Sequence, residues 1–429
     1  MEEVQEKLGG REILLEFKVS FDNTYLWVVQ KNGSARLIRI PVRSRELRSQ
    51  VTAVLDSITD DPLATFNPEP ARLLFELLLK DALHDVAEGT PLVFVPDDAL
   101  QQLPFEVLVT NSSTSSGIQY LAAKYPISYY PSAGTLMVQR SVSGVRDWAF
   151  PLLAVADPVP LPENSGVGPS LLRSPVAAVT SSHSYLDDAV TRGYRFAPLP
   201  ATRREVMDIA VILKIAPAPP HVLIGQATKA TLLKREAGED LSRYRFIHLA
   251  THGLLGTDVP GLNQPALLLS QDAGQDENIS LLTMDEIFKL KLTAEMVVLS
   301  ACQTGRGEVV PGEGIIGLTR AFLHAGARAV VVSHWNVADD ATAIFMSRFY
   351  HYLLNEGMDK AQALQKARLD LLTGTVGGKA LAERGIGGIA QQGKVAEAKP
   401  SAGAISGSAS LSIAHPYFWA PFILVGEGK

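Results

Sequence analysis

The sequence predicts an α/β protein whose mainly parallel sheet is flanked by helices. Three apolar segments carry this prediction, FIHLA (246–250), MVVLS (296–300) and AVVVS (329–333). Each is a continuous apolar run, which is typical of a strand whose two faces are both covered by helices. From residue 201 onward such strands alternate with helical patterns, and this alternation is typical of a parallel sheet.

Composition narrows the class of protein. The chain has 429 residues, which is too long for one ordinary core and corresponds to about three ordinary domains or two large ones. Hydrophobic residues make up 46% and charged residues 20%, as in globular proteins. The net charge is −6, from 39 Lys and Arg against 45 Asp and Glu, and there is no basic tract. We therefore expect no direct nucleic-acid partner.

Other features argue against membranes, secretion and metals. The apolar runs are far shorter than the roughly 20 residues that a membrane span requires. The first ten residues, MEEVQEKLGG, are too acidic and polar for a secretory signal, so a cytoplasmic location is expected. Cys302 is the only cysteine, which excludes an intramolecular disulfide and a zinc site with two thiolates. We expect no cofactor and no bound metal.

In the N-terminal part, residues 1–150, β-forming and helical patterns alternate irregularly. Residues 12–40 have the turn signals of a hairpin, and 44–58 and 69–87 have helical patterns. The segment 91–96 is predicted to be a short buried strand, and LPFEVLV (103–109) and ISYYPS (127–132) are predicted to be extended.

The second domain is expected to cover residues 151–429. Its predicted strands are 150–158, 221–225, 244–251, 266–270, 296–302, 328–334 and 417–426. Its predicted helices are 201–214, 228–236 (capped by Thr228), a brief one opened by the capping box Thr283–Glu286, 313–326, 338–355 and 358–373. Two stretches rich in Gly, Ser, Ala or Pro, about 157–200 and 373–412, are expected to be flexible insertions.

Two of the predicted strands end in side chains that can perform chemistry. FIHLATHG ends in His252 and Gly253, and MVVLSACQTG leads into Cys302. Because the carboxyl ends of parallel strands meet at one edge of a sheet, the imidazole and the thiol are expected on the same edge. A cysteine nucleophile reacts as its thiolate, and a nearby histidine can accept the proton. The backbone N–H groups of Gly253 and Cys302 are candidates for an oxyanion hole.

Each residue also has a plainer interpretation. A free cysteine is most often a small buried hydrophobic residue, and a histidine near a strand end is most often structural. The apolar core of the second strand is Val297–Leu299, however, and Cys302 lies beyond it. This position favours the catalytic interpretation.

The motifs HLATHG, VVLSACQTGRGEVVPGEGIIGLTRAFLHAGARAVVVSHWNVAD and HPYFWAPFILVG together resemble the CHAT domain. This family is a caspase-like branch of the cysteine peptidases that include caspases, metacaspases, gingipains and separase. The match is strong over 244–425, with weaker hallmarks upstream. The 50-residue separation of His252 and Cys302 is also about that of the caspase pair.

The resemblance implies a caspase-like fold with specific roles for individual residues. His252 matches the family's catalytic histidine, Cys302 its nucleophile, and Gly253 the glycine whose amide helps the oxyanion. Residues 1–150 would form a degenerate caspase-like subdomain without a dyad.

Three further residues are assigned to substrate binding. Ser300 lies two positions before Cys302, where several relatives have an acidic residue that binds a basic P1 side chain. Serine has no such charge, which argues against Arg or Lys specificity, and a small or hydrophobic P1 side chain is kept as the alternative. Gln303 is expected to order the loop after Cys302, and Trp335 is expected either to line the pocket or simply to pack.

The leading hypothesis is therefore a cysteine endopeptidase that cleaves a protein substrate through a thioester. An inactive CHAT scaffold or signalling module, or an acyltransferase or amidase acting on a small molecule, remain as alternatives. CHAT domains often follow tetratricopeptide (TPR) repeats, so we expect gating by an upstream helical region or a TPR or other regulatory partner. MEEVQEKLGG resembles the remnant of a preceding helix.

Overall fold

The structure is a computed structural model. It describes residues 2–61, 64–113, 117–142, 146–158, 199–238, 241–254, 262–270, 281–300, 315–335, 339–374 and 413–429. The predicted insertions are about 157–200 and 373–412. Residues 159–198 and 375–412, which make up most of them, lie outside the described residues.

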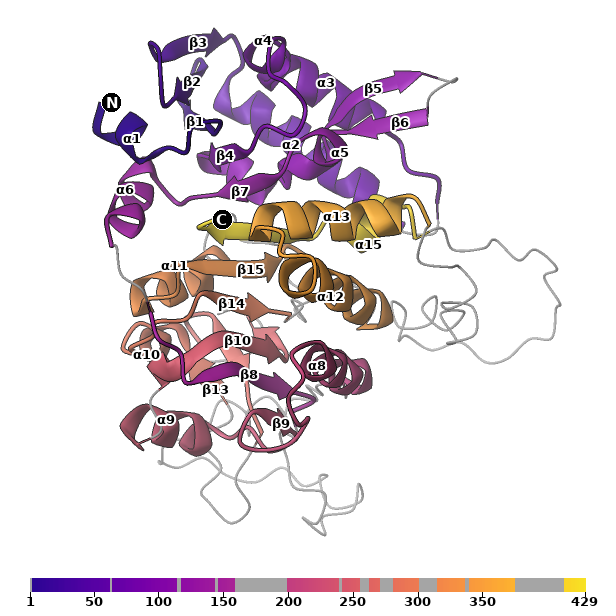
Figure 1. Ribbon diagram of the computed structural model, residues 1–429. Coiled ribbons are helices and arrows are strands. Elements are labelled where there is room, and N and C mark those ends of the chain that lie inside the picture. Colours follow the sequence, from indigo (N-terminus) through magenta and orange to yellow (C-terminus); the bar gives the residue numbers. More distant parts are fainter. Residues whose placement is uncertain are drawn as a thin grey trace, which may run out of the picture.

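One large sheet runs through the molecule (Figure 1). Its strands follow the order β3 (Arg36–Ile40), β2 (Thr24–Gln30), β1 (Ile13–Val19), β4 (Leu92–Val95), β7 (Ile127–Tyr129), β16 (Phe422–Gly426), β15 (Ala329–Ser333), β14 (Met296–Leu299), β10 (Tyr244–Ala250), β8 (Phe150–Ala156) and β9 (Val222–Ile224). We call β3 to β7 the N-terminal block and β15 to β9 the C-terminal block. The last strand of the chain, β16, lies between the two blocks.

Apart from β2, the strands of the N-terminal block run opposite to those of the C-terminal block. Strands β1, β4, β7 and β16 are mutually parallel, and so are β15, β14, β10, β8 and β9. The β16–β15 pair between them is antiparallel, with Ser333 opposite Phe422. The carboxyl ends of β8, β10, β14 and β15 therefore meet at one edge of the sheet, which we call the carboxyl edge of the C-terminal block.

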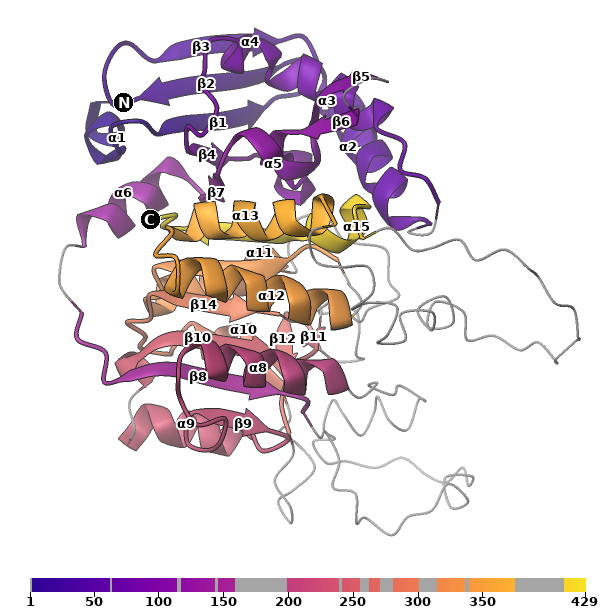
Figure 2. The same cartoon turned by 45° about the vertical axis from the view of Figure 1, so that its right-hand side comes forward.

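Helices cover both faces of the sheet. On one face of the sheet, Figure 2 shows three helices side by side: α8 (Pro200–Ile212), α12 (Asp339–Leu354) and α13 (Lys360–Leu372), of which α13 lies over β16 and β7. The other face packs against α9 (Lys229–Gly238), α10 (Met284–Ile287) and α11 (Ile315–Ala325), around side chains such as Leu153, Ile247 and Phe322. Because both faces are covered, the strands are apolar at consecutive positions, as the sequence indicates.

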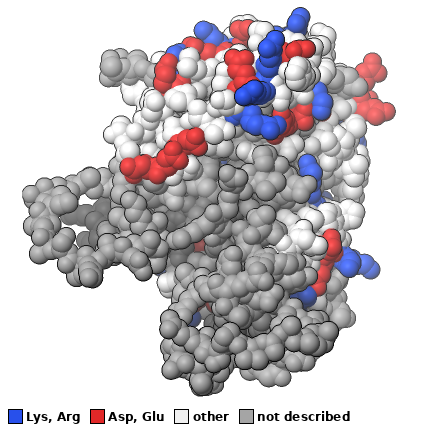
Figure 3. All heavy atoms as spheres, turned by 180° about the vertical axis from the view of Figure 1, so that it is seen from behind, with Lys and Arg blue, Asp and Glu red and all other residues white. Residues whose placement is uncertain are grey.

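The N-terminal block is layered in the same way. One face packs against α2 (Ser44–Thr59) and α3 (Glu69–Leu78), and the other against α1 (Glu2–Lys7) and α6 (Ala133–Ser141). The remaining elements are α4 (Lys80–Leu83), α5 (Leu121–Lys124), α15 (Pro416–Trp419), the hairpin β5 (Val109–Ser113) and β6 (Gly117–Tyr120), the small sheet β11 (Gly253–Leu254), β12 (Ala266–Leu268) and β13 (Leu281–Thr283), and 3₁₀ turns at Asp98–Gln102, Phe105–Val107 and Leu241–Arg243. On the face shown in Figure 3, acidic and basic side chains are interspersed over the N-terminal block.

The predicted fold class is confirmed. The predicted caps at the starts of α9 and α10 are confirmed as well. Thr228 accepts a hydrogen bond from the Thr231 N–H at 3.1 Å at the start of α9. The capping box of Thr283 and Glu286 opens α10. Such caps satisfy the N–H groups that the first helical turn leaves without partners.

Two predictions of extended structure are wrong in part. In 103–109, residues Phe105–Val107 form a 3₁₀ turn, which is stabilised where the Phe105 N–H donates to the Tyr129 hydroxyl at 2.8 Å. In 417–426, the helix α15 precedes β16, because Pro416 suits a first helical turn and the His415 side chain caps it. Of the predicted strand 296–302, residues Met296–Leu299 form β14. Residues 301 and 302 lie outside the described residues.

A buried ionic cluster joins the N-terminal block to α13 and β16. Arg368 on α13 donates to Glu106 Oε1 at 2.9 Å and to the Phe422 carbonyl at 2.5 Å. The Tyr129 hydroxyl donates to the second oxygen of Glu106 at 2.5 Å. Burial raises the pKa of Glu106, while Arg368 and Tyr129 counteract the rise. The cluster thus connects the N-terminal block, α13 and the start of β16.

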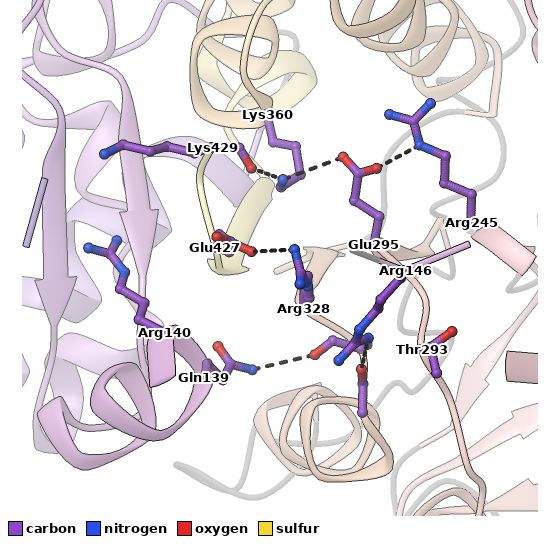
Figure 4. Close-up of polar contacts among 12 residues, drawn as sticks. Gln139, Arg140, Arg146, Arg245, Thr293, Glu295, Arg328, Lys360, Glu427 and Lys429 are labelled. Atoms are coloured by element: carbon purple, nitrogen blue, oxygen red, sulfur yellow. Dashed lines mark hydrogen bonds and ion pairs between the residues drawn. The ribbon is translucent and has the colours of Figure 1, made fainter. Parts of the chain in front are cut away.

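A second network connects the blocks at the opposite edge (Figure 4). Glu295 pairs with Arg245 at 2.6 Å and with Lys360 at 3.7 Å. Lys360 also donates to the Lys429 carbonyl, and Arg328 lies 3.7 Å from Glu427. The C-terminal segment is therefore held at both ends of β16.

The buried cluster predicts a large loss of stability on Arg368→Ala. The substitution leaves the Glu106 carboxylate buried without its cation, and breaking such a pair costs about 3–5 kcal/mol. Urea unfolding should report a lower midpoint. Arg48→Ala is the control, because the Arg48–Asp98 pair (2.9 Å) is half-exposed and is worth less than about 1 kcal/mol. Equal losses in the two variants would contradict the role assigned to the cluster.

Candidate active site

His252 lies at the carboxyl edge, two residues after β10. The Leu268 N–H donates to the His252 carbonyl at 2.9 Å, and the Thr251 hydroxyl donates to the Leu268 carbonyl. Gly253 begins β11 and pairs with Leu267 of β12. These contacts fix the backbone on either side of His252, whose residue surface is only 4% exposed. In Figure 2, β11 and β12 lie at the carboxyl-edge side of the sheet.

The neighbouring strand β14 brings Ser300 to the same edge. The register pairs Phe246 with Met296 and Leu249 with Leu299, and the Ser300 N–H continues it by donating to the Leu249 carbonyl at 3.1 Å. Ser300 is 4% exposed, and its hydroxyl has no hydrogen-bond partner within the parts of the chain that the structure describes. Cys302 and Gln303 lie outside the described residues.

His334 and Trp335 follow β15 at this edge. The His334 N–H donates to the Pro421 carbonyl at 2.9 Å, and Trp335 Nε1 donates to the Tyr417 carbonyl at 3.0 Å. The Trp335 ring packs against Ala341 of α12 and against Phe418. Trp335 therefore ties the edge to the C-terminal segment, which is the packing role weighed for it from the sequence.

Three polar side chains at the edge, those of Ser300, His334 and Thr342, are uncharged at neutral pH. Burial lowers the pKa of His334 to about 4, so its imidazole is neutral. Its Nε2 atom, the Ser300 hydroxyl and the Thr342 hydroxyl of α12 are buried without partners among the described residues. Ser300, His334 and Thr342 can exchange hydrogen bonds with a bound group, but they supply no negative charge that would attract a basic side chain.

A buried polar cluster below His252 is absent from the sequence-based prediction. His248, four residues earlier on β10, contacts Glu205 of α8 and Tyr350 of α12. The sequence shows only a single histidine within an apolar strand. Its partners lie 43 and 102 residues away, so no local pattern indicates the cluster. Only the packing of two helices on one strand brings these three residues together.

Asp157 is a second residue that the sequence did not single out as special. It directly follows β8 and has a positive φ of 44°, in the left-handed region that few residues other than glycine adopt. Its carboxylate accepts the Leu199 N–H at 3.0 Å and pairs with Arg203, and its own N–H donates to Thr202. Asp157 thus fastens the first turn of α8 to the carboxyl edge.

The described residues contain neither a metal-ligand cluster nor a membrane-spanning helix. No group of three or more His, Cys, Asp or Glu side chains within these residues is arranged to hold a metal ion. None of the helices in the described ranges combines the length and apolar character needed to cross a bilayer.

The structure thus defines an α/β protein with a helix-covered, mostly parallel sheet, in which His252, Gly253 and Ser300 lie at the carboxyl edge. The chain belongs to the CHAT domain family, which matches residues 68–427. The family prediction made from the motifs is therefore confirmed.

The chain is similar in sequence to curated proteins. The chain is 27% identical to human tetratricopeptide repeat protein 28 over 340 residues, which is 71% of this chain and 12% of that protein. The mouse protein of the same name is 28% identical over 228 residues, 46% of this chain and 9% of that protein. The chain thus spans 12% or less of the length of these curated relatives.

Among solved structures, the chain is similar to the Saccharomyces cerevisiae separase–securin complex. One structure gives a TM-score of 0.49 at 11% identity over 99% of this chain and 30% of the other. A second gives 0.46 at 12% identity over 86% of this chain and 29% of the other.

The pKa of His334 predicts a pH-dependent stability. The unfolded imidazole, with a pKa near 6.5, binds a proton before the folded one does, so stability falls as the pH drops from 6.5 toward 4. The loss reaches up to about 3 kcal/mol, since one pKa unit corresponds to about 1.4 kcal/mol. Urea unfolding of His334→Asn between pH 7 and pH 4 should show a shallower decline than the wild type. Parallel declines would show that His334 does not titrate in this way.

Proposed function

We propose that this chain is a cysteine endopeptidase in which His252 and Cys302 form the catalytic dyad. One observation carries the proposal: the register of β10 and β14 pairs residues whose numbers differ by 50, from Phe246–Met296 to Leu249–Leu299. Positions 252 and 302 differ by the same number. Two strands that kept this register would bring them side by side. Membership of the CHAT family and the position of His252 at the carboxyl edge support the same assignment.

The chemistry follows from these groups. His252 accepts the proton of the Cys302 thiol, and the thiolate attacks the carbonyl carbon of the scissile peptide bond. The N–H groups of Gly253 and Cys302 would stabilise the oxyanion of the tetrahedral intermediate. His252 then gives its proton to the leaving amine, the C–N bond breaks, and a thioester remains. Water, deprotonated by His252, hydrolyses the thioester and regenerates the thiol. No cofactor or metal enters these steps.

We further propose that the substrate is a protein with an uncharged residue before the cleaved bond. Ser300, Gln303 and Trp335 are the residues assigned to its recognition. A serine two positions before the nucleophile has no charge to pair with Arg or Lys, and the neighbouring His334 is neutral. These features favour a small or hydrophobic P1 side chain.

The arrangement of the chain suggests how the site is regulated. Curated relatives carry the name tetratricopeptide repeat protein, which supports gating by a TPR region or another protein partner. Residues 1–150 would act as a degenerate caspase-like subdomain and residues 151–429 as the catalytic one, in the cytoplasm. Strand β16 pairs with both blocks, so a partner that binds the N-terminal block would act on the same sheet as the site.

The second candidate function is a scaffold or signalling module that has lost catalysis. The presence of both dyad residues and of Gly253 favours the enzyme. Labelling of Cys302 by an electrophilic peptide probe would support the enzyme, whereas a thiol inert between pH 6 and 9 would support the scaffold. An acyltransferase or amidase would use the same dyad on a small molecule instead of a peptide.

Cleavage-site profiling of a peptide library tests the proposal. Cys302→Ala and His252→Ala should each abolish cleavage, because each removes one half of the dyad, while their thermal unfolding stays close to that of the wild type. Cleavage by the Cys302→Ala variant at the wild-type rate would refute the assignment of the nucleophile.

The assignment of Ser300 has a test of its own. Ser300→Asp supplies the missing negative charge, so the variant should cleave peptides with Arg or Lys at P1 at least tenfold faster relative to the wild type. Thr342→Asp is the matched control, because it places a carboxylate at the same edge from α12. An unchanged P1 profile in a folded Ser300→Asp variant would remove Ser300 from the pocket.

A further inference from the structure

His248 is a fully buried histidine on the strand that carries His252. Strand β10 ends at Ala250, so His248 lies two residues before its end and four before His252. Side chains alternate between the faces of a strand, and the ring of Phe246 packs edge-on against Tyr350 at 5.9 Å. The even-numbered residues of β10 therefore face α8 and α12.

Both ring nitrogens of His248 are engaged by these helices. Nε2 lies 2.8 Å from Glu205 Oε1 of α8, and Nδ1 lies 3.3 Å from the Tyr350 hydroxyl of α12. His248 is 0% and Glu205 1% exposed, and Tyr350 is fully buried. One imidazole thus fastens two helices to the strand that leads to His252.

The chemistry of the partners indicates which atoms donate in these two contacts. A carboxylate only accepts hydrogen bonds, so Nε2 of His248 carries a proton. Burial, together with the charge of Glu205, raises the pKa of Tyr350 well above its ordinary range, so the phenol keeps its proton and can donate to Nδ1. Glu205 Oε2 has no partner in the part of the chain that the structure describes.

Stability alone does not account for such a cluster. A buried charged or polar pair can often be replaced by apolar residues of similar volume with no loss of stability or with a gain. The surrounding core is apolar, with Phe246, Ala250 and Phe349 close by in sequence or space. Directional hydrogen bonds instead give one defined arrangement of β10, α8 and α12.

Both helices begin at the carboxyl edge. Asp157 fastens the first turn of α8 there, and α12 begins shortly after Trp335. The segment from 248 to 252 is held at its other end by the hydrogen bonds of Thr251 and His252 to Leu268. Contacts on both sides therefore fix the end of β10 relative to the two helices.

We propose that His248 is a positioning residue: through Glu205 and Tyr350 it sets the orientation of the β10 end and so of the His252 imidazole. The proposal rests on the proposed dyad for its effect on catalysis, but the orientation of His252 can be measured without catalysis. It adds three residues to the site that the strand motif does not reveal.

The test combines a mild variant with a matched control. Tyr350→Phe removes only the hydroxyl that faces His248. Tyr352→Phe, two residues along α12, removes a hydroxyl that donates to Asp370 at 2.5 Å instead. A third protein, His248→Phe with Glu205→Met, replaces the pair by apolar groups and covers the case in which the single change is too small to detect.

The first readout is NMR of the ¹³C-labelled histidine rings of the full chain. The nine histidines can be assigned by single substitutions, including His252→Gln. We expect the His252 ring signal of Tyr350→Phe and of the double variant to shift or broaden and its titration midpoint to move by at least 0.3 pH unit, as order-of-magnitude thresholds for a changed hydrogen-bond environment. Tyr352→Phe should match the wild type. A folded double variant with an unchanged His252 signal and midpoint would overturn the proposal.

The second readout is peptide cleavage. The double variant should lose about tenfold in kcat with KM within about twofold, the pattern of a lost transition-state interaction. If the wild type neither cleaves peptides nor reacts with the probe, the proposed peptidase function fails, whereas the NMR result still decides whether His248 positions His252. If the double variant cleaves peptides with the kcat of the wild type, the positioning role of His248 is contradicted and the peptidase function is not.

Discussion

The parallel pairing of β10 with β14 is the constraint on which the candidate site depends. Parallel strands end at the same edge, and here the register keeps a constant difference of 50 residues along the pair. This pairing brings His252 and Ser300 to the carboxyl edge. The surrounding hydrogen bonds refine the position: Leu268 holds the backbone of His252, and Leu249 holds that of Ser300.

The last strand makes the two blocks of the molecule one sheet. Strand β16 pairs antiparallel with β15 and parallel with β7, and Arg368 holds its first carbonyl while it pairs with Glu106 from the N-terminal block. At its other end, Glu427 and Lys429 join the network around Arg328 and Lys360 (Figure 4). Because Pro421 accepts the His334 N–H, the same segment also contacts the carboxyl edge.

Much of this arrangement follows from the sequence. Continuous apolar runs predict the central strands, since both faces are buried. The rule that parallel strands end together predicts that His252 and Cys302 share an edge, and the structure describes His252 and Ser300 there, while Cys302 lies outside the described residues. Aromatic segments are less predictable. The run 417–426 has no periodicity that separates helix from strand. Its first part forms a helical turn because Pro416 suits the first turn and the His415 side chain caps it. The turn at Phe105–Val107 depends on Tyr129, which lies more than 20 residues away.

The buried cluster of His248 could not be predicted from local patterns. Its partners come from two helices, and the contact exists only after the helices pack on the sheet. The same is true of Arg368 and Glu106, which are 262 residues apart. Side chains that satisfy one another across such distances leave no spacing in the sequence. The motif around His252 is visible because its residues are consecutive.

The reactivity of the single cysteine tests the central claim most directly. Alkylation of Cys302 by iodoacetamide, followed from pH 5 to 10, reports the pKa of its thiol without any substrate, and no other cysteine contributes. A dyad with His252 predicts a midpoint clearly below the ordinary value of about 8.5, restored to about that value in His252→Gln. An ordinary midpoint that is the same in both proteins would contradict the account.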